Sequence, residues 1–191
     1  MEDKRKAVLD TATELFSGNG YHAVGIDRII AEAGVAKMTM YRHFPSKHVL
    51  VVEVLKEHAS VCSESLSEFV AGIDDPEAQL RAVFRWHDRW FHSPPFRGSM
   101  FTHAASEFND KTDEVHRVSV EQKQQLTTFL RNILKQQLSA RKATELAQTF
   151  IMLLDGATLT AQISGRLTAA TEAWSAAKIL LAVARANEVA S

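Results

Sequence analysis

Positive charge and hydrogen-bond donors are concentrated in one short segment of the sequence, residues 34–48. This segment holds three basic residues, two histidines and no acid, so its local charge is +3 while the whole chain carries −1. Lys, Thr, Tyr and His side chains suit the phosphate oxygens of a nucleic acid, and an Arg can bind a guanine edge with two hydrogen bonds. An ordinary solvated basic surface has the same composition. Whether these side chains bind a nucleic acid therefore depends on the secondary structure that positions them.

The residues before Pro45 predict three helices, the second and third of them short. Each has an apolar stripe at helical spacing, and each ends at a glycine-containing turn or at the proline. The tight turn at Gly34-Val35 is typical of a helix-turn-helix, in which one short helix braces another that enters a major groove. Burial of the third stripe would leave the polar side chains from Lys37 to His43 outside. The three stripes are Val8, Ala12, Leu15 and Phe16; Ile26, Ile29, Ile30 and Ala33; and Met40 and Phe44.

The stretch LDTATELFSGNGYHAVGIDRIIAEAGVAKMTMYRHFPSKHVL resembles the N-terminal domain of the tetracycline-repressor (TetR) family. The resemblance covers roughly residues 6–55. It implies an all-α fold of about nine helices, with a helix-turn-helix DNA-binding domain at residues 1–46 and a ligand-binding and dimerisation domain at residues 47–191. Its most specific residues are Ile30, Ala31, Gly34, Val35, Thr39, Tyr41, Phe44, Ser46 and Lys47, with Leu15, Phe16 and Gly20 upstream.

The resemblance also implies a mode of action. A homodimer, formed through the last two helices, would bind a palindromic operator in double-stranded DNA as a repressor, and a small-molecule effector of unidentified structure would release it. Three residues depart from the family pattern. Gly25 and Ala36 stand where the family commonly has hydroxyl residues, which weakens two contacts, and His48 replaces a common acid. By analogy with the family, the residues expected to contact DNA are Gly25, Arg28, Lys37, Thr39, Tyr41, Arg42, His43 and Lys47.

The remainder of the chain is also predicted to be helical. Only four prolines and eight glycines interrupt a sequence rich in helix-forming residues. Ser46 is a suitable N-cap for a long helix that Gly72 and the turn at residues 74–76 would end. Further helices are expected at residues 77–92, 99–108, 114–138, 141–164 and 170–188.

An aromatic region at residues 77–108 is the candidate site for a small ligand. Aromatic side chains with a few polar groups among them are typical of such pockets, although an ordinary helix-packing core has the same composition. The candidate pocket residues are Trp86, Trp90, Met100, Phe101, His103 and Glu107.

The sequence is also compatible with two other functions. One is a DNA-binding architectural protein without an inducer; the other is an all-α metal or carboxylate enzyme using His103, Glu107 and His116. We expect no enzyme and no cofactor, because neither a nucleophile motif nor a phosphate-binding glycine loop is present. A charged N-terminus, the single Cys62 and the lack of a long apolar run predict a cytoplasmic protein without a membrane span.

Overall fold

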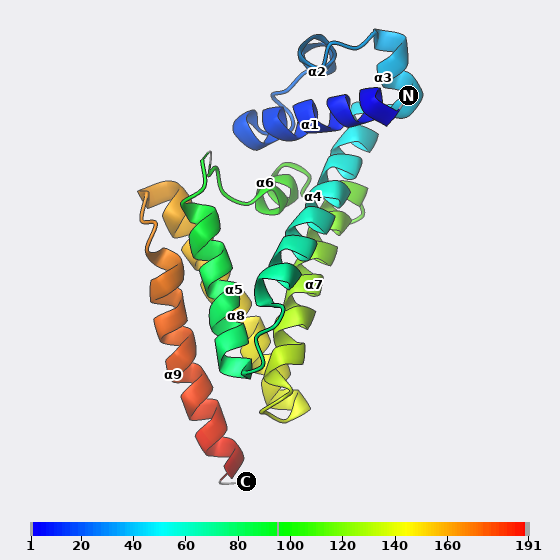
Figure 1. Cartoon of the computed structure of the whole chain (residues 1–191). Coiled ribbons are helices and arrows are strands. Elements are labelled where there is room, and N and C mark those ends of the chain that lie inside the picture. The colour runs from blue at the N-terminus through cyan, green and yellow to red at the C-terminus, as the bar shows by residue number, and fades with distance from the viewer. Residues whose placement is uncertain (1, 95, 190–191) are drawn as a thin grey trace. The chain divides into compact units, whose positions relative to one another are not determined.

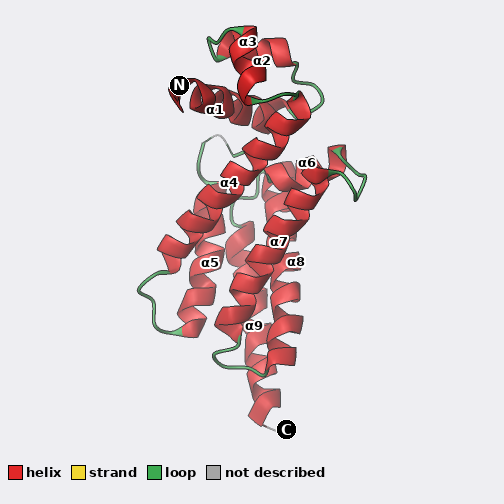
Figure 2. Ribbon diagram, turned by 90° about the vertical axis from the view of Figure 1, so that its right-hand side faces the viewer, coloured by secondary structure: helices red, strands yellow, loops and turns green. Residues whose placement is uncertain are grey.

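The computed structural model describes residues 2–94 and 96–189 of the chain. Within these ranges the backbone forms nine α-helices and no β-strand (Figures 1 and 2), so the predicted all-α fold class is confirmed. None of these helices is both long enough and apolar enough to cross a membrane. In chain order they are α1 (Glu2–Asn19), α2 (Ile26–Glu32), α3 (Lys37–His43), α4 (Lys47–Val70), α5 (Pro76–Phe91), α6 (Met100–Glu107), α7 (Glu114–Leu134), α8 (Ala140–Ser164) and α9 (Ala169–Val189).

The chain packs as two compact units. One comprises the chain up to Val61 together with Ser99–Gln122, and the other comprises Cys62–Gly98 and the chain from Lys123 onward. The first unit therefore contains α1, α2, α3 and α6 with the beginnings of α4 and α7. The functional division into residues 1–46 and 47–191 stays a prediction, because packing shows only which residues are buried together.

The core of the first unit is built on the apolar stripes that the sequence predicts. All four α1 stripe residues are buried, and Ile29 of α2, Met40 of α3 and Phe44 are completely excluded from solvent. The other three residues of the α2 stripe are partly buried. Because Met40 and Phe44 are one helical turn apart, their burial fixes which side of α3 faces outward.

In the second unit, α5 and α8 both pack against α9 (Figure 1). The Phe84 ring of α5 connects the three helices: its centroid lies 5.7 Å from that of Phe150 on α8 and 5.4 Å from that of Trp174 on α9. Full burial of one such phenylalanine stabilises a fold by roughly 1.5–3 kcal/mol. A shared aromatic contact of this kind therefore holds the second unit together.

Helix ends follow local chemistry. Ser46 caps α4 by accepting a hydrogen bond from the Val49 N–H at 3.1 Å, as predicted. Asp75 caps α5 in the same way, accepting from the Ala78 N–H at 2.6 Å. The helix predicted at residues 114–138 is shorter in the structure, because α7 ends at Leu134 and residues 135–137 form turns. Tighter hydrogen bonds to the third preceding residue, including Gln137 N–H to the Leu134 carbonyl at 3.1 Å, replace the α-helical pattern there.

Candidate nucleic-acid interface

The outward side of α3 is exposed as the sequence predicts. Lys37, Met38, Tyr41 and Arg42 are all exposed, while Met40 points into the core. Thr39 and His43 lie at the edge of this face and are partly buried. Of the polar side chains on α3, Lys37, Tyr41 and Arg42 are thus the most accessible to a ligand.

The positive charge of this face is partly neutralised by α2. Lys37 Nζ donates to a carboxylate oxygen of Asp27 at 3.0 Å, and this hydrogen bond raises the pKa of the Lys37 ammonium. Arg28 forms a similar pair with Glu32 one turn away, at 2.7 Å. Among the described residues, Arg42 makes no hydrogen bond or ion pair with its side chain. Arg42 is therefore the cation on α3 whose donors are all available.

Lys47, the first residue of α4, is tied to the turn between α1 and α2. Its Nζ donates to the carbonyl oxygen of His22 at 3.3 Å. Partial burial lowers the pKa of this ammonium, although the carboxylate of Glu107 opposes the shift. The ammonium thus already has one hydrogen-bond acceptor, and two of its three donors remain for another ligand.

The two departures at helix starts have direct structural consequences. Gly25 is the N-cap of α2 and Ala36 is the N-cap of α3, and neither provides a side-chain capping bond. A Cβ added at Gly25 would meet no atom within 4 Å. At both positions only the backbone can form a hydrogen bond with a ligand.

A sequence model described as "Bacterial regulatory proteins, tetR family" matches residues 8–54, which run from α1 into α4. A solved structure of a TetR-family transcriptional regulator from Streptomyces coelicolor superposes with a TM-score of 0.90 at 28% identity, covering 97% of each chain. The chain belongs to the TetR family. A second TetR-type structure, from Streptomyces avermitilis, gives a TM-score of 0.81 at 26% identity and covers 95% of this chain and 97% of its own.

Curated transcriptional regulators match less than half of the chain. The HTH-type transcriptional activator FasR of Mycolicibacterium smegmatis is 36% identical over 82 residues, which are 43% of this chain and 37% of the relative. The HTH-type transcriptional regulator LmrA of Bacillus subtilis is 31% identical over 84 residues, which are 44% of this chain and 45% of the relative. The matches thus span less than half of these relatives.

In this TetR-family chain, Glu107 has a role that the sequence did not reveal. Its carboxylate oxygens accept hydrogen bonds from the backbone N–H groups of Tyr21 at 2.9 Å and His22 at 2.6 Å. The buried Tyr21 hydroxyl donates to the carbonyl oxygen of Met100, at the other end of α6, at 2.9 Å. Two bonds to a carboxylate and one to a carbonyl thus fasten the turn after α1 to both ends of α6.

Gly20 is required for this arrangement. Its φ of +79° lies in the left-handed region, and a Cβ there would lie 2.7 Å from Oε1 of Glu107. The glycine thus ends α1 and makes room for the carboxylate. The sequence showed the helix end but not the acid, which is 86 residues away from Tyr21.

The six candidate pocket residues are divided between the two units. Trp86 and Trp90 pack against the core of the second unit, whereas Met100 and Phe101 are buried in the core of the first. His103 and Glu107 also belong to the first unit. Their joint role in ligand binding stays a prediction, and Glu107 already has the two partners described above.

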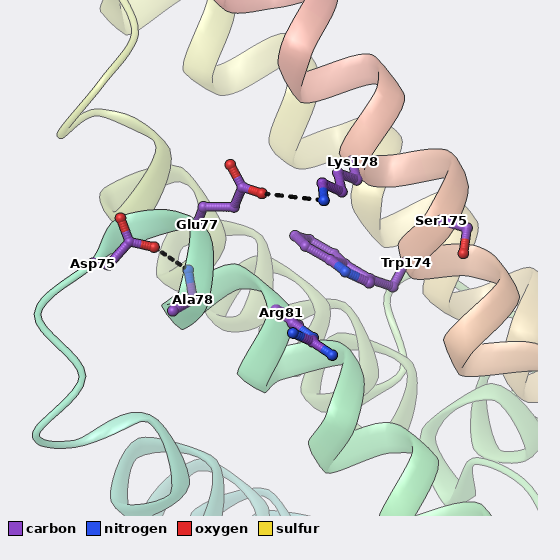
Figure 3. A pocket seen from close by; sticks show the side chains of 7 residues that line it. All are labelled: Asp75, Glu77, Ala78, Arg81, Trp174, Ser175 and Lys178. Carbon is purple, nitrogen blue, oxygen red and sulfur yellow. Dashed lines mark hydrogen bonds and ion pairs between the residues drawn. The ribbon is translucent and has the colours of Figure 1, made fainter.

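A pocket of about 430 Å³ lies between α5 and α9 of the second unit (Figure 3). Figure 3 shows the Trp174 ring between Arg81 and the ion pair that Glu77 and Lys178 form at 4.0 Å. Glu77 is held more closely by Arg185, at 2.6 Å. No local sequence pattern predicted this pocket, since its two helices are far apart along the chain. The residues lining it are Asp75, Glu77, Ala78, Arg81, Trp174, Ser175 and Lys178.

The three residues of the alternative metal enzyme, His103, Glu107 and His116, are not arranged as a metal site. No group of three or more His, Cys, Asp or Glu side chains within the described ranges is placed to hold a metal ion. His116 Nδ1 lies 2.9 Å from the carbonyl oxygen of Phe108, so this ring contacts the backbone after α6. His103, Glu107 and His116 thus do not form such a group.

Proposed function

We propose that this TetR-family chain is a DNA-binding transcriptional regulator, acting as a repressor, and that α3 enters the major groove of its operator. The observation that supports this most is the orientation of α3. Burial of Met40 and Phe44 leaves Lys37, Tyr41 and Arg42 exposed on a segment without acids. The outward side chains of the second helix enter the major groove in known helix-turn-helix complexes.

The proposed contacts divide by chemistry. Arg42 would bind a guanine edge with its guanidinium, because all its donors are available. Lys37, Thr39, Tyr41, His43 and Lys47 would contact phosphates, and Arg28 and the Gly25 backbone would add contacts from α2. Phosphate binding by Lys37 and Arg28 requires their ammonium and guanidinium groups to exchange acidic partners for DNA, so these two would contribute less than their charge suggests.

We further propose a homodimer that pairs α8 and α9 with their copies. Exposed apolar residues recur along one side of α8 at Met152, Leu159 and Ile163, and along α9 at Ile179 and Val183. Apolar side chains in such a row stabilise an interface when a second copy covers them. A two-fold dimer would present two copies of α3 to successive major grooves, about 34–36 Å apart, which requires a palindromic operator.

A small-molecule effector would release the DNA if it binds the DNA-free conformation more tightly than the DNA-bound one. Two regions of the second unit are candidates: the surroundings of Trp86 and Trp90, and the pocket at Trp174. Substituting Phe for each tryptophan distinguishes them. The variant that abolishes the effect of an active compound on DNA affinity, while leaving that affinity itself unchanged, identifies the region.

The direct test is selection of bound fragments from random DNA by the purified protein, followed by fluorescence anisotropy with the selected site. We expect a palindromic consensus and a steep loss of affinity with increasing salt. Tyr41→Ala and Lys47→Ala should weaken binding to all sequences alike, whereas Arg42→Ala should relax base preference. Equal affinity for all sequences and no response to any compound would instead support an architectural protein, and unchanged binding by all three variants would contradict the interface.

A further inference from the structure

Met38 is the most exposed large apolar side chain among the described residues, with 81% of its surface accessible. It lies in the first turn of α3, directly after Lys37. Apolar surface left in water gains none of the free energy that burial provides. This methionine therefore contributes little to the stability of the first unit. Stability does not explain why an apolar residue lies on the outward face of α3.

The neighbours of Met38 define a mixed surface. Met38 and Arg42 are four residues apart and so lie next to each other on the helix. The Arg42 side chain has no hydrogen-bond or ion-pair partner among the described residues, and Tyr41 is exposed beside it. The outward face of α3 thus combines one apolar tip with one guanidinium whose donors are available.

The major groove of DNA offers few groups that an apolar side chain can bind favourably. Purine and cytosine edges present donors and acceptors, which a thioether cannot satisfy well, whereas thymine presents its C5 methyl group. A methionine is flexible and polarizable, so it can adapt its rotamer to contact that methyl group. Guanine is the base that the neighbouring Arg42 would bind.

We propose that Met38 determines operator specificity by packing against the C5 methyl group of a thymine in each half-site. This inference rests on the proposed function. Along α3 the Cα atoms of Met38 and Arg42 are about 6 Å apart, at a rise of about 1.5 Å per residue. Successive base pairs are about 3.4 Å apart, so the thymine lies within about two base pairs of the guanine that Arg42 binds.

The test replaces each thymine of the selected operator, one at a time, with deoxyuridine, which removes only the methyl group. We expect one half-site position at which this change weakens binding of the unchanged protein by about threefold to tenfold. Met38→Ala should bind the thymine and deoxyuridine operators equally at that position. Met38→Leu keeps an apolar side chain, so it should still bind the deoxyuridine operator more weakly than the thymine operator.

Val61→Ala is the matched control, because Val61 is an exposed apolar residue of α4 outside α3. It should retain the full deoxyuridine effect. The inference is overturned if the protein binds its operator specifically but every deoxyuridine effect is the same with and without Met38, or if the half-site contains no thymine. Failure to prefer the selected operator over scrambled DNA would instead overturn the proposed function.

Discussion

The carboxylate of Glu107 accepts the backbone N–H of Tyr21 at 2.9 Å and, with its other oxygen, the N–H of His22 at 2.6 Å. Both N–H groups follow the glycine that ends α1, and each has a carboxylate oxygen of Glu107 as its acceptor instead of a backbone carbonyl. The His22 carbonyl accepts in turn from Lys47, a proposed DNA contact. One acid of α6 thereby fixes the turn from which α2 and the start of α4 are positioned.

Glu107→Gln should loosen this turn, because a glutamine side chain offers one neutral oxygen in place of two charged ones. Hydrogen bonds to a charged group contribute roughly 1.5–3 kcal/mol each, so we expect the free energy of unfolding to fall by roughly 1–2 kcal/mol. Amide hydrogen exchange at Tyr21 and His22 should accelerate. Glu121→Gln, an exposed change on α7, should alter neither; unchanged exchange in Glu107→Gln would contradict the role of the carboxylate.

Ala36→Ser should stabilise the first unit. Ala36 is the N-cap of α3 with φ −72° and ψ 145°, an extended conformation from which a serine Oγ can accept a hydrogen bond from the first turn. Replacing an alanine cap with serine contributes about 1 kcal/mol to the free energy of unfolding. Ala31→Ser makes the same chemical change on the exposed surface of α2 and should destabilise slightly, because serine is a weaker helix former. Equal effects in urea denaturation would show that no cap forms.

Local patterns predicted the helices because their causes lie within a few residues. The α1 stripe, the turn at Gly34 and the burial of Met40 and Phe44 all follow from spacing along one helix or across one turn. For the same reason the sequence predicted which side of α3 is exposed.

Partners that are distant in sequence left no such pattern. Asp27 neutralises Lys37 from another helix, so the local charge of residues 34–48 overstates the positive charge of the interface. Trp86 and Glu107 were predicted to line one pocket because they lie in the same stretch of sequence. The structure assigns them to different packing units. The sequence alone does not distinguish a carboxylate that lines a ligand pocket from one that accepts backbone N–H groups at a helix end, because its partners decide the role.

Ile179→Glu should prevent dimerisation without unfolding the protein. Ile179 is 66% exposed on α9, so the charge costs little while the surface is in water. In a two-fold interface both copies would carry the charge, and burying it should raise the dimer dissociation constant about 100-fold or more. Sedimentation velocity measures this directly, and operator affinity should fall with it. Met38→Glu, at a side chain of α3 that is even more exposed, should leave the sedimenting mass unchanged. A dimeric Ile179→Glu would place the interface elsewhere.

Buried His87 should make the protein sensitive to acid. Burial lowers the pKa of its imidazole from 6.5 to about 4, even though its Nδ1 lies 2.9 Å from the Val83 carbonyl oxygen. Between these two values the unfolded chain binds a proton that the folded chain does not, so the free energy of unfolding falls as the pH decreases through this range. The loss is complete near pH 4 and amounts to roughly 3 kcal/mol for a shift of this size.

His87→Gln removes the titrating group and should flatten the pH dependence of urea denaturation between about pH 4 and pH 6.5. The variant will be less stable near neutral pH, because its side chain packs differently among the surrounding aromatic rings. The decisive quantity is therefore the slope with pH and not the stability itself. His92→Gln changes an exposed histidine at the end of the same helix and should keep the slope of the unchanged protein. If His87→Gln keeps that slope as well, the acid sensitivity arises from other groups.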